Sequence, residues 1–211
     1  MEDWVQRALA KWPNVPHLYG WIHLDRRGQW FLQGERVDRP KLIDMMRFNY
    51  AADDRGCWFF QNGPQRGYVT LAYTPLVFRV QPGGDLIAHT DQTPMQIRQF
   101  CLDSDGSVVL DTDLGAGCLD GEDLPWVLEH LDVQGGGSVE SAVDAALGLP
   151  SGSQTTLRLD WRDRSIAVMR LDANAMPTSL GFDREPQPPE AGACIKEGPA
   201  KPALLIADAV N

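Results

Sequence analysis

Two nine-residue segments of this 211-residue chain, LDRRGQWFL and LDSDGSVVL, share a pattern and lie 78 residues apart. When Asp25 is aligned on Asp103, Gly28 falls on Gly106, and the apolar residues that follow stay in register. An Asp at the first turn position and a Gly at the fourth, between short apolar strands, are typical of a β-hairpin with a type I turn and a bulge. The repetition therefore predicts a folding unit that occurs twice.

The similarity continues into a helix after each hairpin, once four residues are inserted in the second copy. In the first copy Asp38 can cap the helix and Pro40 suits its first turn. In the second copy LPWVLEHL is the matching helix, capped by Asp120 or Asp123. These shared residues serve folding, so we interpret them as duplicated structure, with chance similarity as the alternative. Shared catalysis would instead place the two turn aspartates together in one cleft.

The remaining sequence fits an α+β fold of two related units, each made of short antiparallel strands with a packed helix. QPGGD marks the break between the units, SVESAVDAALG predicts a helix from Ser138 to Gly148, and two alternating segments after it predict a last hairpin. We expect an N-terminal unit over 1–82, a C-terminal unit over 83–185 and a Pro/Gly-rich tail over 186–211.

Composition restricts the partners. The net charge is −10, but the first 82 residues hold 11 Lys and Arg against 8 Asp and Glu, so the excess of acid lies in the second half. Such a surface repels phosphate backbones, which argues against nucleic-acid binding. No apolar run is long enough to span a bilayer, and no secretory signal is evident at the N-terminus. We expect a soluble cytoplasmic protein without a membrane partner.

Residues 3–12 place apolar side chains on one helical face, and Pro13 ends the run. A short amphipathic helix packed on the first unit is the expected structure. The four cysteines are scattered without a CxxC pair, and we interpret them as buried or incidental thiols.

Sequence motifs for catalysis, metals and cofactors are missing. The chain has no GxSxG, Walker or GxGxxG pattern, and its four histidines form no metal-ligand spacing. The segment CLDSDGSVVLDT resembles a calcium loop, but Cys101 and Thr112 would occupy positions where calcium needs carboxylates. We expect no metal and no cofactor. A hydrolase remains the rival hypothesis, with His89 or His130 paired either with an Asp or with Cys57 or Cys101.

The segment WFFQNGPQRGYVTLAYTP, residues 58–75, holds polar side chains that the fold does not require. Asn62 begins a good hairpin turn, which by itself needs no function. Gln65, Arg66, Tyr68 and Tyr73 then place planar donors and hydroxyl groups along one strand region, where Arg can grip an anion and Tyr can stack. These five residues are the predicted binding site, with a purely structural role as the alternative.

The same region carries a family resemblance. GWIHLDRRGQWFLQGERVDRPKLIDMM, followed by GCWFFQNGPQRGYVTLAYTPLVF, resembles a bacterial family known as domain of unknown function 1285, most clearly over residues 20–80. The resemblance implies an α+β fold of repeated motifs with a signalling or ligand-sensing role, and it implies no enzyme activity. Where that family leads us to expect an acidic-then-basic pair, this chain has Gln65 and Arg66, so a charge-pair role does not carry over to Gln65.

Three functions follow from these observations. We favour a regulatory module that binds a small molecule or a protein partner, because the scaffold is duplicated and lacks a catalytic signature. The first alternative is a hydrolase whose site is assembled from distant residues. The second is a purely structural or assembly protein, which a large apolar surface patch would favour.

Overall fold

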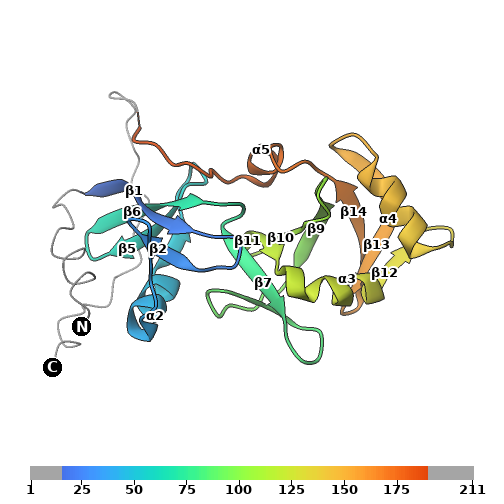
Figure 1. The fold of residues 1–211 in the computed structure, drawn as a ribbon, viewed down its shortest axis with the longest axis horizontal. Coiled ribbons are helices and arrows are strands. Elements are labelled where there is room, and N and C mark those ends of the chain that lie inside the picture. The colour runs from blue at the N-terminus through green and yellow to red at the C-terminus, as the bar shows by residue number, and fades with distance from the viewer. Residues whose placement is uncertain (1–15, 190–211) are drawn as a thin grey trace.

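The computed structural model describes residues 16–189, which form two β-sheets placed one after the other along an elongated molecule (Figure 1). The expected α+β class is confirmed only in part: the fold contains both helices and strands, but β-structure dominates and helices are few. Neither sheet is purely antiparallel as expected, since each contains parallel pairs as well. Residues 3–12, for which a helix is predicted, lie outside the described residues.

The first sheet has six strands in the order β3-β2-β1-β6-β5-β4. Helix α2 connects β3 to β4. The bounds of these elements are β1 His17–Leu24, β2 Trp30–Leu32, β3 Glu35–Arg36, α2 Pro40–Phe48, β4 Tyr50–Ala52, β5 Trp58–Asn62 and β6 Gln65–Leu71.

The second sheet has eight strands in the order β12-β13-β14-β9-β10-β11-β7-β8. Its strands are β7 Leu76–Val80, β8 Leu86–Ala88, β9 Ile97–Leu102, β10 Val108–Thr112, β11 Gly115–Leu119, β12 Leu131–Val133, β13 Ser153–Trp161 and β14 Arg164–Arg170. The helices of this part of the chain are the 3-10 helix η1 Gly121–Asp123, α3 Leu124–His130, α4 Val139–Leu147 and α5 Met176–Leu180.

Six strands of the two sheets follow the same spatial order. Strands β3-β2-β1-β6-β5-β4 of the first sheet correspond to β11-β10-β9-β14-β13-β12 of the second, which β7 and β8 extend beyond β11. In each sheet the first and the last strand of the series pair in parallel at the centre: Leu24 lies opposite Leu71, and Leu102 lies opposite Arg170. Strand β7 pairs with the second sheet although it precedes the break at QPGGD, which forms the turn between β7 and β8.

Helix α2 begins at Pro40, and Arg39 is its N-cap residue without a side-chain cap. The cap expected at Asp38 is absent, because the residue before a proline is held extended, so the helix starts at the proline itself. The predicted caps of α4 are confirmed: the Ser138 hydroxyl accepts a hydrogen bond from the backbone N–H of Ser141, and Gly148 ends the helix. In the second unit Asp120 caps η1, which precedes α3.

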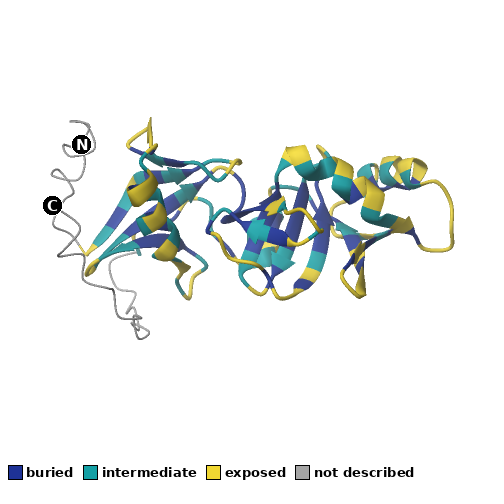
Figure 2. Ribbon diagram, turned by 90° about the horizontal axis from the view of Figure 1, so that it is seen from below, coloured by how far each residue is buried: buried dark blue, intermediate teal, exposed yellow. Residues whose placement is uncertain are grey.

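The interior is apolar and runs through both sheets as one cluster of contacting side chains. Figure 2 shows the buried residues concentrated in the strands and the exposed ones along helices and turns. Three cysteines, Cys57, Cys101 and Cys118, are buried free thiols; Cys194 lies outside the described residues. None of the helices between residues 16 and 189 is both long and apolar enough to cross a bilayer.

After β14 the chain returns along the molecule to the first sheet, passing through α5 (Figure 1). Arg184 accepts at its carbonyl a hydrogen bond from the N–H of Leu71, 2.8 Å away. The N–H of Asp183 donates to the carbonyl of Gly56 at 3.0 Å. This returning segment, residues 171–189, therefore joins the end of the second sheet to the first.

Candidate functional site

The turn aspartates of the first sheet stabilise their own turns. Oδ1 of Asp25 accepts hydrogen bonds from the backbone N–H groups of Arg27 (2.9 Å) and Gln29 (2.8 Å). Asp53 repeats this geometry at the next hairpin, with bonds of 3.0 Å from the second and fourth residues after it. Asp25 is therefore a folding residue, as its position in the hairpin predicts, and it faces its own loop rather than a cleft shared with Asp103.

Asp103 occupies the matching position in the second sheet but acts at longer range. Its side chain is almost fully buried, with 2% exposed. Oδ1 accepts from the N–H of Ser104 at 2.6 Å and from the N–H of Ala173 at 3.0 Å. Oδ2 accepts from the hydroxyl of Tyr73 at 2.7 Å. This carboxylate therefore ties the second sheet to the connection between β6 and β7 and to the returning segment.

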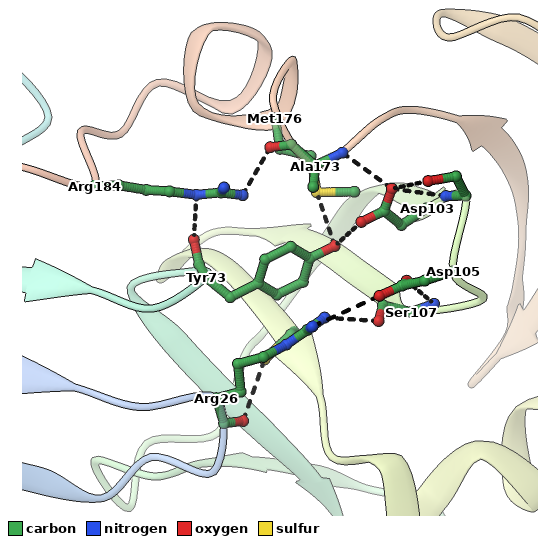
Figure 3. A network of polar contacts seen from close by, with 10 residues as sticks. Arg26, Tyr73, Asp103, Asp105, Ser107, Ala173, Met176 and Arg184 are labelled. Carbon is green, nitrogen blue, oxygen red and sulfur yellow. Dashed lines mark hydrogen bonds and ion pairs between the residues drawn. The ribbon is translucent and has the colours of Figure 1, made fainter.

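Tyr73 is the centre of a network of polar contacts at the junction of the two sheets (Figure 3). Its ring has guanidinium groups at 4.1 Å from Arg26 and 5.1 Å from Arg184. Arg184 also donates to the carbonyls of Tyr73 (2.8 Å) and Ala173 (2.7 Å). Burial, followed by the hydrogen bond to Asp103, raises the pKa of Tyr73 well above its usual value, so this hydroxyl stays a donor.

The two similar turns meet at this junction. Nη2 of Arg26, in the β1–β2 turn, donates to Oγ of Ser107 at 2.7 Å, and its Nη1 lies 3.6 Å from Oδ2 of Asp105. The residue before Gly28 is an arginine, Arg27, whereas the residue before Gly106 is Asp105. The two turns thus carry opposite charges at matching positions, which favours their contact.

A pocket of about 420 Å³ opens beside these turns. The first sheet contributes only residues of its β1–β2 turn, whereas the second contributes residues from β7, β10, β11, η1 and α3. Its lining residues are Arg26, Arg27, Gln29, Arg79, Ser107, Val108, Cys118, Leu119, Asp120, Gly121, Glu122 and Leu124.

Within residues 16–189, the contacts of the two histidines proposed for a hydrolase include no cysteine. His89 packs against the rings of Trp30 and Tyr50, and its Nδ1 accepts a hydrogen bond from the N–H of Val77 at 3.2 Å. Burial lowers the pKa of His89 to about 3, so it is neutral at physiological pH. His130 contacts the Trp126 carbonyl through Nδ1 at 2.8 Å.

The thiols of Cys57 and Cys101 are also unsuited to nucleophilic attack, because burial raises the pKa of each to about 12. Cys118 lines the pocket, yet burial raises its pKa as well. Among residues 16–189 no group of three or more His, Cys, Asp and Glu side chains is placed to hold a metal ion. The arrangement at the junction is suited to binding by charge and hydrogen bonds.

The predicted binding residues lie in two places: Asn62, Gln65, Arg66 and Tyr68 belong to the β5–β6 hairpin, where Arg66 and Tyr68 both contact the ring of Phe59, whereas Tyr73 lies apart. Asn62 and Gln65 lie opposite each other at the end of the β5–β6 hairpin. Arg66 is half-buried next to them: its guanidinium lies 4.6 Å from the ring centre of Phe59, and its Nε donates to Gln61 at 3.4 Å. The hairpin turn itself is confirmed.

Tyr68 belongs to a small cluster on the face of the first sheet opposite the main core. It is 2% exposed, and its ring stacks on Tyr19 with centroids 4.5 Å apart. Its hydroxyl donates to Oδ2 of Asp53 at 3.2 Å. Burial, with the charge of Asp53, raises the pKa of Tyr68 to about 12. Tyr73 lies elsewhere, in the junction network.

The arginines of the pocket are not among the predicted site residues. A signal for them was present in the sequence, because a type I turn with a bulge needs its Asp and Gly but not two adjacent arginines. In the sequence, Arg26 and Arg27 are therefore charged residues that the turn itself does not require. Arg79, on β7, reaches the pocket only because β7 pairs with β11, a contact that local sequence does not reveal.

The comparisons with known proteins concern the family and the fold. A family model named DUF2944, described as "Protein of unknown function (DUF2946)", matches residues 1–187. The chain belongs to this family. No curated protein matches it.

The resemblance of this DUF2944 chain to domain of unknown function 1285 is confirmed by a solved structure that shares its fold. A DUF1285 family protein from Silicibacter pomeroyi DSS-3 aligns over 80% of this chain and 96% of its own, with a TM-score of 0.51 and 12% identity. A second, from Shewanella baltica OS155, aligns over 52% of this chain and 91% of its own, with a TM-score of 0.41 and 15% identity. At such low identity the first of these shows a shared fold and nothing about ligands.

Proposed function

We propose that the protein is a regulatory module that binds a small molecule in the pocket at the junction of its two sheets. The pocket itself carries this proposal: its volume of about 420 Å³ lies within the usual range for small-ligand sites. It combines an apolar floor, formed by residues such as Val108 and Leu119, with charged groups at its rim, including Arg27 and Arg79. Ligand sites in proteins typically combine these two features.

A regulatory role is supported by the fact that both sheets contribute residues to the pocket. The β1–β2 turn of the first sheet and the strands of the second contribute to the same pocket, and the contacts between the turns are polar and exposed. A ligand that touches both sides favours the arrangement in which both sides reach it. Binding would therefore change how the two units are held together, and a partner protein could read that change.

The test is a ligand screen with a blocked pocket. Gly121 lines the pocket, its φ is not positive, and an added Cβ would meet no atom within 4 Å, so Gly121→Phe adds bulk there without backbone strain. Gly148→Phe is the matched control, because this glycine at the end of α4 also lacks a positive φ and lies outside the pocket. Metabolites are screened by thermal shift against the parent, and hits are repeated on both variants.

A ligand present at 100 times its Kd stabilises the folded protein by about 2.7 kcal/mol, which corresponds to roughly 5–10 °C for a chain of this size. We expect Gly121→Phe to abolish this shift and Gly148→Phe to keep it. Hits that shift Gly121→Phe as much as the parent would contradict the proposal, and so would a broad screen without any hit.

We infer further that the two sheets arose by duplication of one unit. The two copies would then correspond to the two units expected on either side of residue 82. Support comes from the common strand order and from the hydrogen bonds that close the central pairs. The N–H of Ala72 donates to the carbonyl of Leu24, and the N–H of Leu171 donates to the carbonyl of Leu102, both at 2.9 Å. Strands β7 and β8 would be an addition to the second copy.

Two expectations remain part of the proposal. The buried free thiols of Cys57, Cys101 and Cys118 support a cytoplasmic location, which fractionation of cells that express the chain would test. The β5–β6 hairpin, with Asn62, Gln65 and Arg66 at its end, remains a predicted surface for a protein partner. Its support is the half-buried Arg66, whose guanidinium is held over Phe59 close to the surface.

A further inference from the structure

We propose that the ligand of the junction pocket is an organic anion with an apolar body, and that it competes with Asp105 for the side chain of Arg26. This inference rests on the proposed function, because it specifies the ligand class and the regulation of the same pocket. It follows from the partners that each charged lining residue has, or lacks, in the structure.

The pocket presents more unused cationic donors than unused carboxylates. The side chain of Arg27 makes no hydrogen bond or ion pair with any residue between 16 and 189. Arg79 uses only Nε, which donates to Oδ2 of Asp120 at 3.2 Å, so both of its terminal nitrogens are available. Asp120 is fully engaged, since its Oδ1 accepts from the N–H of Glu122 at 3.1 Å. Among the lining residues, two arginines therefore have unused donors, whereas one carboxylate, that of Glu122, is unused.

An arginine binds a carboxylate, sulfonate or phosphate group through two parallel N–H donors, a geometry that a neutral ligand cannot match. The floor beneath these donors is apolar: Val108 and Leu119 are buried core residues, and Leu124 is half-buried beside them. A ligand that uses both features carries an acidic group at one end and an apolar portion at the other. A fully hydrated inorganic anion would use only the rim.

Arg26 connects the pocket to the contact between the two sheets. It lines the pocket, yet its terminal nitrogens point to Ser107 (2.7 Å) and Asp105 (3.6 Å), and its guanidinium lies 4.1 Å from the ring centre of Tyr73. Its side chain is about half exposed, as is that of Asp105, so this ion pair is weak and can exchange partners. An anion in the pocket attracts the same guanidinium. Binding of the anion and the Arg26–Asp105 contact therefore oppose each other.

The probes are chosen to separate charge from apolar character. 8-Anilinonaphthalene-1-sulfonate is an apolar anion whose fluorescence rises on binding, and N-phenyl-1-naphthylamine is its neutral analogue. Inorganic phosphate serves as a purely ionic competitor. All are titrated against the full chain, the Gly121→Phe variant described above, and the double variant Arg27→Gln/Arg79→Gln. The control for the double variant is Arg36→Gln/Arg164→Gln, which removes the same charge from two exposed positions outside the pocket.

We expect the sulfonate probe to bind the parent and the control alike, and to bind the double variant roughly tenfold or more weakly, because charge-assisted hydrogen bonds are lost. The neutral analogue should bind the parent, the control and the double arginine variant equally. Phosphate should displace the sulfonate probe only at concentrations far above those of the probe, since it gains nothing from the apolar floor.

The competition for Arg26 is tested with Asp105→Asn, because an asparagine can still accept the hydrogen bond that Asp105 Oδ1 receives from the N–H of Ser107. Releasing Arg26 from an exposed ion pair should tighten binding of the sulfonate probe about two- to fivefold. The control is Asp85→Asn, which removes the partner of Arg162, an ion pair of 2.9 Å outside the pocket. It should leave the affinity unchanged.

The outcomes distinguish the two proposals. If no probe or metabolite depends on position 121, the proposed pocket function fails. If the probe depends on position 121 but binds the double arginine variant as well as the parent, the pocket stands and the anion class is wrong. If the arginines matter but Asp105→Asn binds no more tightly than Asp85→Asn, the competition for Arg26 is refuted.

Discussion

Replacing Tyr73 by Phe tests whether the junction network holds the two sheets together. The change removes one oxygen atom and keeps the ring between the guanidinium groups of Arg26 and Arg184. It deletes the 2.7 Å hydrogen bond to Oδ2 of Asp103. Because Asp103 is only 2% exposed, water cannot readily replace the lost donor.

A hydrogen bond to a charged group contributes about 1.5–3 kcal/mol to stability, against roughly 0.5–1.5 kcal/mol for a neutral one. Tyr50 offers the matched neutral case, because its hydroxyl donates to the carbonyl of Pro75 at 3.1 Å in the same region. We therefore expect Tyr73→Phe to lower the free energy of unfolding by about 1 kcal/mol more than Tyr50→Phe does.

The measurement is urea unfolding of the parent and both variants at pH 7, followed by tryptophan fluorescence and circular dichroism. Equal slopes against urea concentration would show that the variants unfold from comparable states. A loss for Tyr73→Phe that is no larger than the loss for Tyr50→Phe would refute the assignment of Asp103 as a buried, charged acceptor. In that case Asp103 would be held mainly by the backbone N–H groups.

Three further perturbations have defined outcomes. Gly28→Ala should destabilise the protein by at least ~1 kcal/mol more than Gly106→Ala. Both glycines have a positive φ, but only an added Cβ at residue 28 would lie 2.7 Å from the Cβ of His89. Equal losses in urea unfolding would contradict this close approach. His89 stays neutral in the folded protein while the unfolded chain takes up a proton below about pH 6.5, so stability falls as pH is lowered toward 3, by up to about 1.4 kcal/mol per pH unit. In His89→Asn this acid slope should be shallower, and an unchanged slope would exclude His89 as its source. Arg66→Ala should leave thermal shifts by pocket ligands unchanged, because Arg66 lies on the β5–β6 hairpin outside the pocket; a lost shift would place the ligand at the hairpin.

Local features of this fold were accessible from the sequence. The Asp and Gly of each tight turn predicted the hairpins because their side-chain and backbone preferences act within five residues, as the bonds from Arg27 and Gln29 to Asp25 show. The limits of α4 were predicted for the same reason, since Ser138 and Gly148 act on adjacent backbone groups. The cap predicted at Asp38 was wrong, because α2 begins at Pro40 and Arg39 is its N-cap residue.

Contacts between distant segments were not accessible in this way. The parallel pairing of β1 with β6 and of β9 with β14 depends on packing of whole sheets, and no local preference encodes it. Tyr68 and Tyr73 look alike in the sequence as exposed polar aromatics on one strand region. In the structure Tyr68 stacks on Tyr19, which lies at the bulge in β1. Tyr73 instead lies between β6 and β7, where it donates a hydrogen bond to Asp103.

The parallel pair at the centre of each sheet has a consequence for synthesis of the chain on the ribosome. Strand β9, IRQFCL, receives its second neighbour, β14, only after about sixty further residues have been made. Until then this strand, which is apolar except for Arg98 and Gln99, has one open edge. Such distant pairing slows folding, and an open edge can pair with another chain. A nascent or proteolysed chain that ends after α4 would thus be prone to aggregation, and completion of the last hairpin protects the protein against it.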